Sequence, residues 1–363
     1  AAAPPPSVLS DQDSLPDSSS GSSAARSSPA TIDDVAKDAG VSKASVSRYL
    51  GGGIDLLSEE LRGRIGASIA RLQYEPNQVA RSLKRGRTRL IGMVVADILN
   101  PYSVAVLHGA ETASQKHGYT LMLCNVGNDD QRERQALAAL RSYSVEGLIL
   151  NSLAGRRMQL QKLLPAGVPA VLVDRRLAGG AMDYVGLDNV AAAIAATEHL
   201  IERGYKDLVL LSQPLRGASS RQERDIGFRT VLARRPEATG QTLEIDRNDM
   251  PAVEAQLTAF LAQPGEGRKA IVCGSGVVAL TVVRALHRLG VRIPDDVGLL
   301  SFDELEWSEL VPPGITTIAQ PTFDIGAAAV ECLIQRLNGD RSEARNLLYP
   351  GHLIARGSTA SAS

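Results

Sequence analysis

Apolar residues recur at helical spacing in three short segments between residues 32 and 72. Residues 32–39, 43–50 and 58–72 each carry them three and four positions apart, so each segment is predicted to form a helix. Thr31 and Ser42 are the expected N-caps of the first two helices, and Gly40 supplies the tight turn between them. The expected mini-core consists of Ile32, Val35, Ala36, Val41, Val46 and Leu50. Two short helices joined by a tight turn have the shape of a helix-turn-helix, whose second helix can enter the major groove of DNA.

The pattern changes at Leu90, where short apolar strands begin to alternate with helices. Strands are predicted within residues 90–97, 119–125, 145–151, 168–174, 207–212, 269–275 and 297–303. Helices are predicted around residues 101–117, 130–142, 188–203, 222–234, 277–290 and 323–338. Apolar strands separated by crossover helices indicate parallel sheets that are covered on both faces. About nine strands favour two sheets over one, so the predicted fold class is α/β with a small all-α domain in front.

Two segments lack the composition of a packed domain. Residues 1–30 are rich in Ser, Pro, Ala and Asp and have almost no large apolar side chains, so we expect a disordered extension. Residues 77–89 contain five basic residues and no acidic one, and a segment this short is marginal as an isolated helix but can become ordered against DNA. Between residues 31 and 90, 11 Lys and Arg accompany 7 Asp and Glu, although the whole chain has a net charge of −1. Positive charge is therefore concentrated where nucleic acid would bind.

The remaining composition narrows the class of protein. A chain of 363 residues with 44% apolar content is expected to form two or three domains with substantial cores. No run of 18 apolar residues exists, and the N-terminal residues do not form a secretory signal. The odd number and wide spacing of Cys124, Cys273 and Cys332 fit a reducing compartment better than a disulfide framework.

Several motifs in a fixed order resemble the lactose-repressor family of bacterial transcription regulators. They are TIDDVAKDAGVSKASVSRYL from Thr31, YEPNQVARSLKRGRTRLIGMVVADILNPY from Tyr74, VDRR, GLDN, RDIGF, DDVGLLSFDE and ITTIAQP. The likeness covers roughly residues 31–357. Within the family, the motifs are most similar to those of regulators of gluconate and ketogluconate use.

The resemblance implies a domain organisation. It places a helix-turn-helix domain at 31–76, a hinge helix or linker at 77–88, an effector-binding and dimerisation domain at 89–356 and a disordered tail at 357–363. The effector domain is expected to resemble periplasmic binding proteins, with two parallel-sheet α/β subdomains around a cleft and crossovers near 187–190, 318–322 and 340–347. The resemblance also implies a homodimeric repressor that binds a near-palindromic double-stranded operator on the nucleoid in the bacterial cytoplasm, with no membrane partner.

The exposed face of the second helix is expected to read DNA. Lys43 and Arg48 can donate to guanine O6 and N7, and the methyl group of Ala44 can contact the methyl group of thymine. The resemblance assigns base choice to these three positions. Ser42, Ser45 and Ser47 can serve phosphates and the helix caps. The alternative, a helical hairpin with ordinary surface charges, does not account for the basic segment that follows.

Leu83 is an isolated apolar residue in the basic segment. Such a side chain can act as a wedge between base steps in the minor groove, and the resemblance puts the intercalating leucine of the family at this position. The alternative is a basic linker with one incidental leucine. The residues expected to form the hinge or contact DNA are Asn77, Val79, Ala80, Arg81, Leu83 and Lys84.

Polar residues follow the carboxyl ends of the predicted strands, where open α/β sheets bind ligands. By the family match, Arg224 and Asp303 are the strongest candidates for ligand contact. Trp307 can cover the apolar face of a sugar ring or pack in the core. Ser275-Gly276 stands where many relatives have Asn-Asp or Gly-Asp, so one acidic contact is expected to be absent. The full candidate set is Asp97, Asn100, Tyr102, Asn125, Arg175, Asn189, Arg221, Arg224, Ser275, Asp303 and Trp307.

The candidate set suits a sugar acid such as gluconate or 2-ketogluconate. Carboxylates and amides satisfy sugar hydroxyls, and a guanidinium binds a carboxylate through two hydrogen bonds. Scarce aromatic residues count against a purine effector. A regulator of a neutral sugar or a purine, and a sugar-binding protein without a DNA role, remain alternatives.

Catalytic and cofactor chemistry finds little support in the sequence. GSGVVA at 274–279 is only a weak match to a dinucleotide fingerprint. The five histidines have no metal-ligand spacing with each other or with cysteine. No nucleophile elbow, Walker loop or Ser-His-Asp grouping occurs, so we expect no catalytic residues, cofactor or metal.

Overall fold

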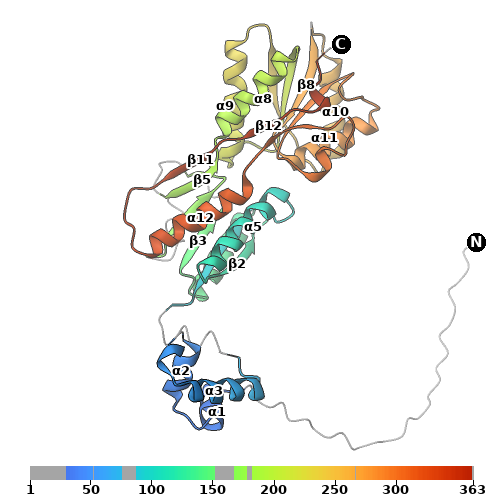
Figure 1. The fold of residues 1–363 in the computed structure, drawn as a ribbon. Coiled ribbons are helices and arrows are strands. Elements are labelled where there is room, and N and C mark those ends of the chain that lie inside the picture. The colour runs from blue at the N-terminus through green and yellow to red at the C-terminus, as the bar shows by residue number, and fades with distance from the viewer. Residues whose placement is uncertain are drawn as a thin grey trace, which may run out of the picture. The chain divides into compact units, whose positions relative to one another are not determined.

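The computed structural model describes residues 30–51, 53–75, 87–151, 167–177, 182–265 and 267–361. The chain divides into two compact units, Ala1–Arg81 and Ser82–Ser363 (Figure 1). Each unit has hydrophobic core residues of its own.

The first unit contains the three predicted helices, α1 (Ile32–Asp38), α2 (Lys43–Leu50) and α3 (Glu59–Leu72), and a 3-10 turn at Ile54–Leu56. The hydroxyl of Thr31 caps α1, and the hydroxyl of Ser42 accepts a hydrogen bond from the backbone of Ser45 at the start of α2. Both predicted caps are therefore confirmed, because a side-chain oxygen satisfies an N–H that the helix leaves without a partner. Val35, Val46 and Ile65 form the fully buried centre of the unit.

Helix α3 fixes the turn between α1 and α2. The Arg64 guanidinium donates to the carbonyl oxygens of Ala39 and Gly40, and Gly40 has a positive φ of 62°. Ser68, fully buried on α3, donates to the Asp38 carboxylate at 2.6 Å. These contacts hold α2 in a set orientation within the unit, as presentation to a DNA groove requires.

The second unit contains two six-stranded sheets. The first sheet has the order β11-β5-β4-β3-β1-β2 and is parallel throughout. The second has the order β12-β10-β9-β8-β6-β7, with β12 antiparallel to β10. Strands of the first sheet are β1 (Leu90–Val95), β2 (Thr120–Asn125), β3 (Gly147–Leu150), β4 (Ala170–Val173), β5 (Asp183–Leu187) and β11 (Asn346–Tyr349). Strands of the second are β6 (Tyr205–Ser212), β7 (Thr239–Glu244), β8 (Arg268–Cys273), β9 (Gly298–Phe302), β10 (Thr316–Ala319) and β12 (His352–Ile354).

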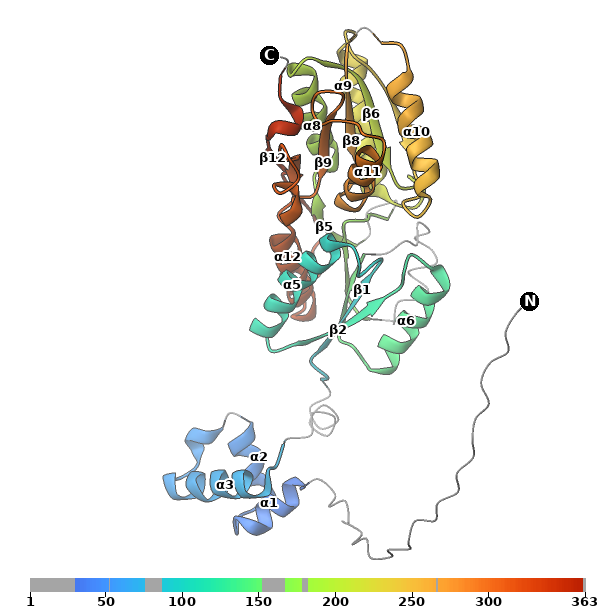
Figure 2. The same cartoon turned by 90° about the vertical axis from the view of Figure 1, so that its right-hand side faces the viewer.

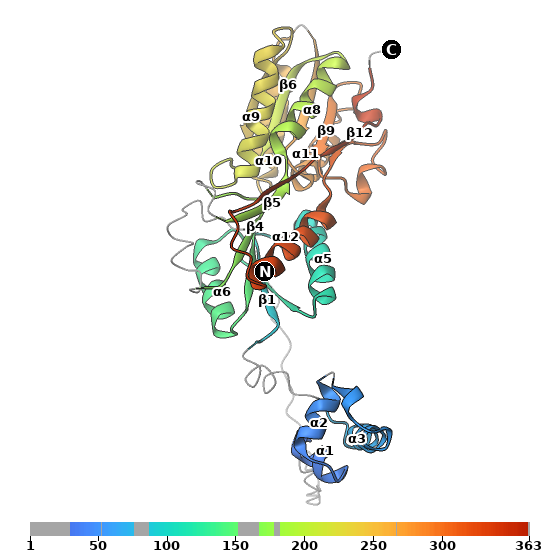
Figure 3. The same cartoon turned by 60° about the vertical axis from the view of Figure 1, so that its left-hand side comes forward.

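Helices cover both faces of each sheet, as the apolar strands predict. Helices α5 (Pro101–Lys116) and α12 (Thr322–Leu337) cover one face of the first sheet, and α6 (Asp130–Ser142) covers the other (Figure 3). Helices α8 (Asn189–Glu202) and α9 (Ser219–Arg234) cover one face of the second sheet, opposite α10 (Met250–Ala262) and α11 (Gly276–Arg288). Glycines bring α5 and α12 together, because a Cβ on Gly109 or Gly326 would lie 2.0 Å from a backbone oxygen of the other helix.

Each sheet and the helices that cover it form one half of this unit: the first sheet belongs to the first half and the second sheet to the second half. The chain passes between the two halves three times. The first passage leads from β5 to α8 and the second from β10 to α12, both where the sequence predicts them. The third lies at Pro350-Gly351, between β11 and β12, and not at 340–347 as expected. The reason is that α12 and β11 both belong to the first half, so the segment between them, residues 338–345, stays within that half.

The expected disordered tail is also corrected. Residues 357–359 form a 3-10 turn in which Ser358 and Thr359 are buried. Their hydroxyls hydrogen-bond to Thr316 at the start of β10. The tail was expected to be disordered, but small hydroxyl side chains can be buried when each finds a partner.

Candidate DNA-reading helix and effector cleft

Helix α2 presents the predicted base-reading residues to solvent. Lys43, Ala44 and Arg48 are exposed, whereas Val46 points into the core and is fully buried. The ammonium of Lys43 pairs with the Asp33 carboxylate at 2.7 Å. Both side chains are more than half exposed. Such a surface pair contributes little stability, so Lys43 is free to exchange this partner for DNA.

The three serines of the predicted set differ in their surroundings. Ser42 is exposed and its hydroxyl lies 3.0 Å from that of Ser45, which is half-buried, as is Ser47. Ser42 is therefore the one that combines a helix cap with an exposed hydroxyl. Asn77, Val79, Ala80, Arg81, Leu83 and Lys84 lie outside the described residues.

At the end of the basic segment, two arginine residues contact the protein rather than solvent alone. The Arg87 guanidinium donates to the Glu146 carboxylate at 3.2 Å and to the Tyr119 hydroxyl at 3.1 Å. The backbone of Arg89 donates to the same carboxylate at 2.8 Å. These contacts fix the start of β1 and hold the pKa of Glu146 below its usual range. Residues 87–89 are thus anchored to the half of the second unit that contains β1.

Arg224 lies at the centre of the predicted cleft set. Its side chain is buried, and its Nε donates to the Asn189 amide oxygen at 2.9 Å. Its Nη1 donates to the carbonyl oxygen of Gly274, and the guanidinium lies 4.2 Å from the centre of the Phe302 ring. All of these direct partners are neutral, so they orient the guanidinium without neutralising it.

Arg221 lies close enough to Arg175 and Arg224 for their charges to lower its pKa. Burial, followed by the charge of Arg175, lowers the pKa of Arg221 to about 10. Arg221 donates to the Pro214 carbonyl and to the Gln213 side-chain oxygen, which are again neutral. Burial also lowers the pKa of Arg175, whose Nε has no hydrogen-bond partner among the described residues. Arg175 lies 3.8 Å from the Asp174 carboxylate, whereas neither Arg221 nor Arg224 has a carboxylate at ion-pair distance among the described residues.

Acceptors and a hydroxyl from both halves lie beside these arginines. Asp303, buried and at a positive φ of 73°, accepts from the backbone of Gly276 at 2.8 Å and from the Gln320 amide at 2.5 Å. Tyr102 is buried, and burial followed by the charge of Asp174 raises the pKa of its hydroxyl. The buried side-chain oxygens without a hydrogen-bond partner among the described residues include those of the Tyr102 hydroxyl and of the Asn151 and Gln320 side-chain amides. Such atoms need donors or acceptors from water or a ligand.

The other predicted residues fall into three groups. Asn100 caps α5, and the Asn125 side chain accepts from the backbone of Ile98 at 3.2 Å, so both shape the loop after β1. Ser275 precedes α11 and makes no side-chain cap. Trp307 is half-buried and packs against the core under α10 and α11, which favours the core interpretation of this residue.

The structure adds site residues that the sequence did not indicate. Glu223 pairs with Arg176 at 3.1 Å and accepts from Asn189, which in turn accepts from Arg224. Arg247 pairs with Asp97 from the other half of the domain. Neither pairing carries a sequence signal, because the partners come from elements that are far apart in the sequence.

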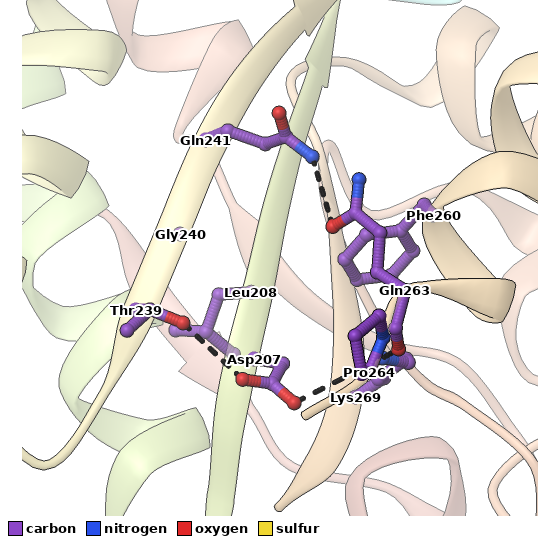
Figure 4. A pocket seen from close by; sticks show the side chains of 9 residues that line it. All are labelled: Asp207, Leu208, Thr239, Gly240, Gln241, Phe260, Gln263, Pro264 and Lys269. Atoms are coloured by element: carbon purple, nitrogen blue, oxygen red, sulfur yellow. Dashed lines mark hydrogen bonds and ion pairs between the residues drawn. The ribbon is translucent and has the colours of Figure 1, made fainter. Parts of the chain in front are cut away.

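A cavity of about 250 Å³ lies away from this cleft, at the amino ends of β6 and β8 (Figure 4). Asp207 and Lys269 approach each other there at 3.9 Å, and the amides of Gln241 and Gln263 approach at 3.4 Å. The polar groups of this cavity thus bind one another.

Two family models match the chain. One describes periplasmic binding proteins and the sugar binding domain of the LacI family and matches residues 88–357. The other describes bacterial regulatory proteins of the lacI family and matches residues 31–77. The chain belongs to the LacI family. This membership confirms the predicted fold class and makes the protein a DNA-binding transcription regulator, not an enzyme.

Individual LacI-family proteins are similar over nearly the whole chain. The transcriptional regulator PtxS of Pseudomonas aeruginosa is 53% identical, covering 91% of this chain and 95% of that protein. The regulator KdgR of Bacillus subtilis is 38% identical, covering 90% and 96%. A structure of the lac repressor dimer bound to operator and the anti-inducer ONPF has a TM-score of 0.79 at 24% identity and covers 92% of this chain and 100% of that one, which shows the shared fold.

Two features are absent from the described residues. None of their helices combines the length and hydropathy needed to cross a membrane. They also contain no group of three or more His, Cys, Asp or Glu side chains arranged to hold a metal ion.

Proposed function

We propose that this LacI-family regulator is a repressor whose operator binding is controlled by a sugar acid, such as 2-ketogluconate or gluconate, bound between the two halves of its effector domain. The observation that carries this proposal is the charge of Arg221 and Arg224. Among the described residues, no carboxylate lies within ion-pair distance of either guanidinium. A buried, oriented cation with neutral partners is a receptor for an anion.

Hydroxyl recognition is available beside the arginines. The oxygens of Tyr102, Asn151 and Gln320 without protein partners can exchange hydrogen bonds with a polyhydroxylated chain. Asp303 adds a carboxylate acceptor. One acidic end and several hydroxyls describe an aldonic or ketoaldonic acid better than a neutral sugar or a flat purine. The similarity to PtxS and KdgR supports a shared effector class.

The effector preference is testable by titration calorimetry with 2-ketogluconate, gluconate and neutral glucose. We expect an acid to bind at least about tenfold more tightly than glucose, because one guanidinium–carboxylate pair in a desolvated site contributes about 1.4 kcal/mol or more. Arg221→Gln should remove that preference. Arg229→Gln, an exposed arginine of α9 that pairs with Asp225, is the matched control. Equal affinities for gluconate and glucose would instead favour the neutral-sugar alternative.

For DNA binding, we propose base contacts by Lys43, Ala44 and Arg48 and a wedge at Leu83. The protein would bind as a homodimer, and exposed apolar side chains such as Leu99, Leu280 and Leu310 are available to an interface. Operator binding can be measured by fluorescence anisotropy with a duplex selected from a random library. Leu83→Ala and Arg48→Ala should each weaken specific binding, and Arg48→Ala by about 1–3 kcal/mol. Unchanged affinity in either variant would exclude the role given to that residue.

A further inference from the structure

One ion pair joins the two halves of the effector domain at the end of the cleft. Nη2 of Arg247 lies 3.0 Å from Oδ2 of Asp97. Asp97 follows β1 in the first half, and Arg247 follows β7 in the second, so 150 residues of chain separate the partners. Because both loops lie at the carboxyl ends of their strands, the pair borders the same cleft as the arginines.

The topology places this pair on the open side of the cleft. The three passages between the halves depart from or arrive at β5, β11, β10 and β12, which lie at one end of each sheet order. Strands β3 and β4 separate β1 from β5, and β7 is at the end of the second sheet opposite β12. Figure 2 shows α12 and β12 on one side of the domain and α6 and α10 on the other. A rotation about the passages therefore separates Asp97 from Arg247 more than it separates residues near the passages.

A second set of contacts between the halves lies near the passages. Arg176 of the first half pairs with Glu223 of α9 at 3.1 Å, and its backbone donates to the Ser219 hydroxyl at 2.7 Å. Glu223 also accepts from Asn189, the first residue of α8 after the first passage. These contacts hold the halves together close to the pivot, where opening moves atoms least.

We propose that the Asp97–Arg247 pair is a clasp that closes the mouth of the effector cleft and determines how long a ligand stays bound. The proposal rests on the proposed effector site. Oδ1 of Asp97 accepts a hydrogen bond from the backbone of Leu99 at 2.9 Å. This bond orients the carboxylate within its own loop and leaves Oδ2 to pair with Arg247. Asp97 was expected to contact the effector, but both of its carboxylate oxygens accept hydrogen bonds from the protein. Side-chain exposures of 29% and 23% leave the pair accessible to water, so it can open reversibly.

The first test uses no ligand. Hydrogen exchange of the full-length protein should become faster in both loops, residues 97–100 and 246–249, when either Arg247→Gln or Asp97→Asn is introduced. The double variant should exchange no faster than either single one, because both remove the same interaction. The swapped protein, with Asp97→Arg and Arg247→Asp, should return toward the parent. Additive effects, or faster exchange confined to the loop that carries the substitution, would overturn the clasp.

The second test uses 2-ketogluconate and gluconate as probes. Each single variant should release a bound acid about three to five times faster, as expected for a partly exposed pair, and less so at high salt. A direct ligand contact predicts the opposite pattern: Asp97→Asn would free Arg247 for the acid and tighten binding, while Arg247→Gln would weaken it. That result would reassign Arg247 from clasp to ligand contact and overturn the proposal.

Arg288→Gln provides the matched control for both tests. Arg288 pairs with Glu254 at 3.3 Å within the second half, so this variant loses a surface ion pair without affecting the cleft. If neither acid binds the parent protein, the proposed effector class is wrong. The exchange measurement still decides whether the clasp exists.

Discussion

The C-terminal part of the chain contacts both halves of the effector domain, and the side chains that make these contacts differ between the halves. In the first half, the Asp183 carboxylate accepts from Arg336 at 2.8 and 2.9 Å and from the backbone and guanidinium of Arg345. In the second half, the Ser358 hydroxyl accepts from the backbone of Thr316 at 2.7 Å and donates to the carbonyl of Leu299 at 2.5 Å. A buried carboxylate with two arginine partners holds the first half, whereas buried hydroxyls, together with the more exposed Arg356–Glu304 ion pair, hold the second.

The difference matters because the two kinds of contact fail in different ways. A buried ion pair leaves an uncompensated charge when one partner is removed, whereas a lost hydroxyl leaves neutral backbone groups without partners. A carboxylate also titrates, and a serine hydroxyl does not. The halves are therefore expected to differ in the size of their response to substitution and in the pH at which each weakens.

The largest effect is expected for Asp183→Asn. The carboxylate is nearly inaccessible, at 2% exposure, and its removal leaves Arg336 and Arg345 without a counter-ion in a half-buried setting. We expect the free energy of unfolding to fall by about 3 kcal/mol at neutral pH. Urea unfolding followed by circular dichroism measures the loss. The control is Glu237→Gln, which breaks the surface pair with Arg235; a similar loss in both variants would refute a special role for charge in the first half.

Local structure could be predicted from the sequence to a greater extent than these long-range contacts. The bounds of α2 and α6 match the predicted 43–50 and 130–142, because caps and apolar spacing are local signals. Strand β7 was not predicted, since TGQTLE at an exposed edge has little apolar pattern. The expected tail was wrong for a related reason: nothing in GST indicates that its hydroxyls find buried partners.

The candidate site shows the same division between local and long-range information. The position of Arg224 after a strand and within a family motif identified it before its contacts were known. The pairing of Asp97 with Arg247 depends on two loops from different halves, and no spacing rule relates residues 150 positions apart. Long-range partners require the tertiary structure.

The next largest effect is expected for Ser358→Ala. The hydroxyl is fully buried, and its loss leaves the N–H of Thr316 and the carbonyl of Leu299 without their partner. We expect a loss of about 2 kcal/mol. The single tryptophan, Trp307, packs in the core of this half, so its fluorescence during urea unfolding reports the change. The loss should be the same at pH 7 and pH 5, because neither the Ser358 hydroxyl nor its two backbone partners titrate. A loss that varies with pH would contradict this account of Ser358.

Mild acid should weaken the second half through His199. Burial, followed by the charge of Arg203, lowers the pKa of this imidazole, whose Nε2 lies 2.8 Å from the Thr359 hydroxyl. The unfolded chain therefore binds a proton at a higher pH than the folded protein does. As a result, the free energy of unfolding falls as the pH drops below the ordinary histidine pKa. Between pH 7 and 5.5 this group can contribute a loss of at most about 1.2 kcal/mol. His199→Gln, which keeps a donor but does not titrate, should show a smaller loss over the same interval.

Stronger acid should weaken the first half, and by a smaller amount. Its arginine partners hold the pKa of Asp183 well below its usual range, despite the opposing effect of burial. The carboxylate therefore stabilises the folded state above its unfolded pKa of about 3.9, and this stabilisation declines as pH falls toward the folded value. At pH 3.5 the decline from this one group is about 0.7 kcal/mol. The measurement is the difference in unfolding free energy between the parent and Asp183→Asn, which should be constant from pH 7 to 5 and should narrow below pH 4. If the difference in unfolding free energy already narrows near pH 6, a group other than Asp183 titrates. The two halves would then not differ in the pH at which they lose stability.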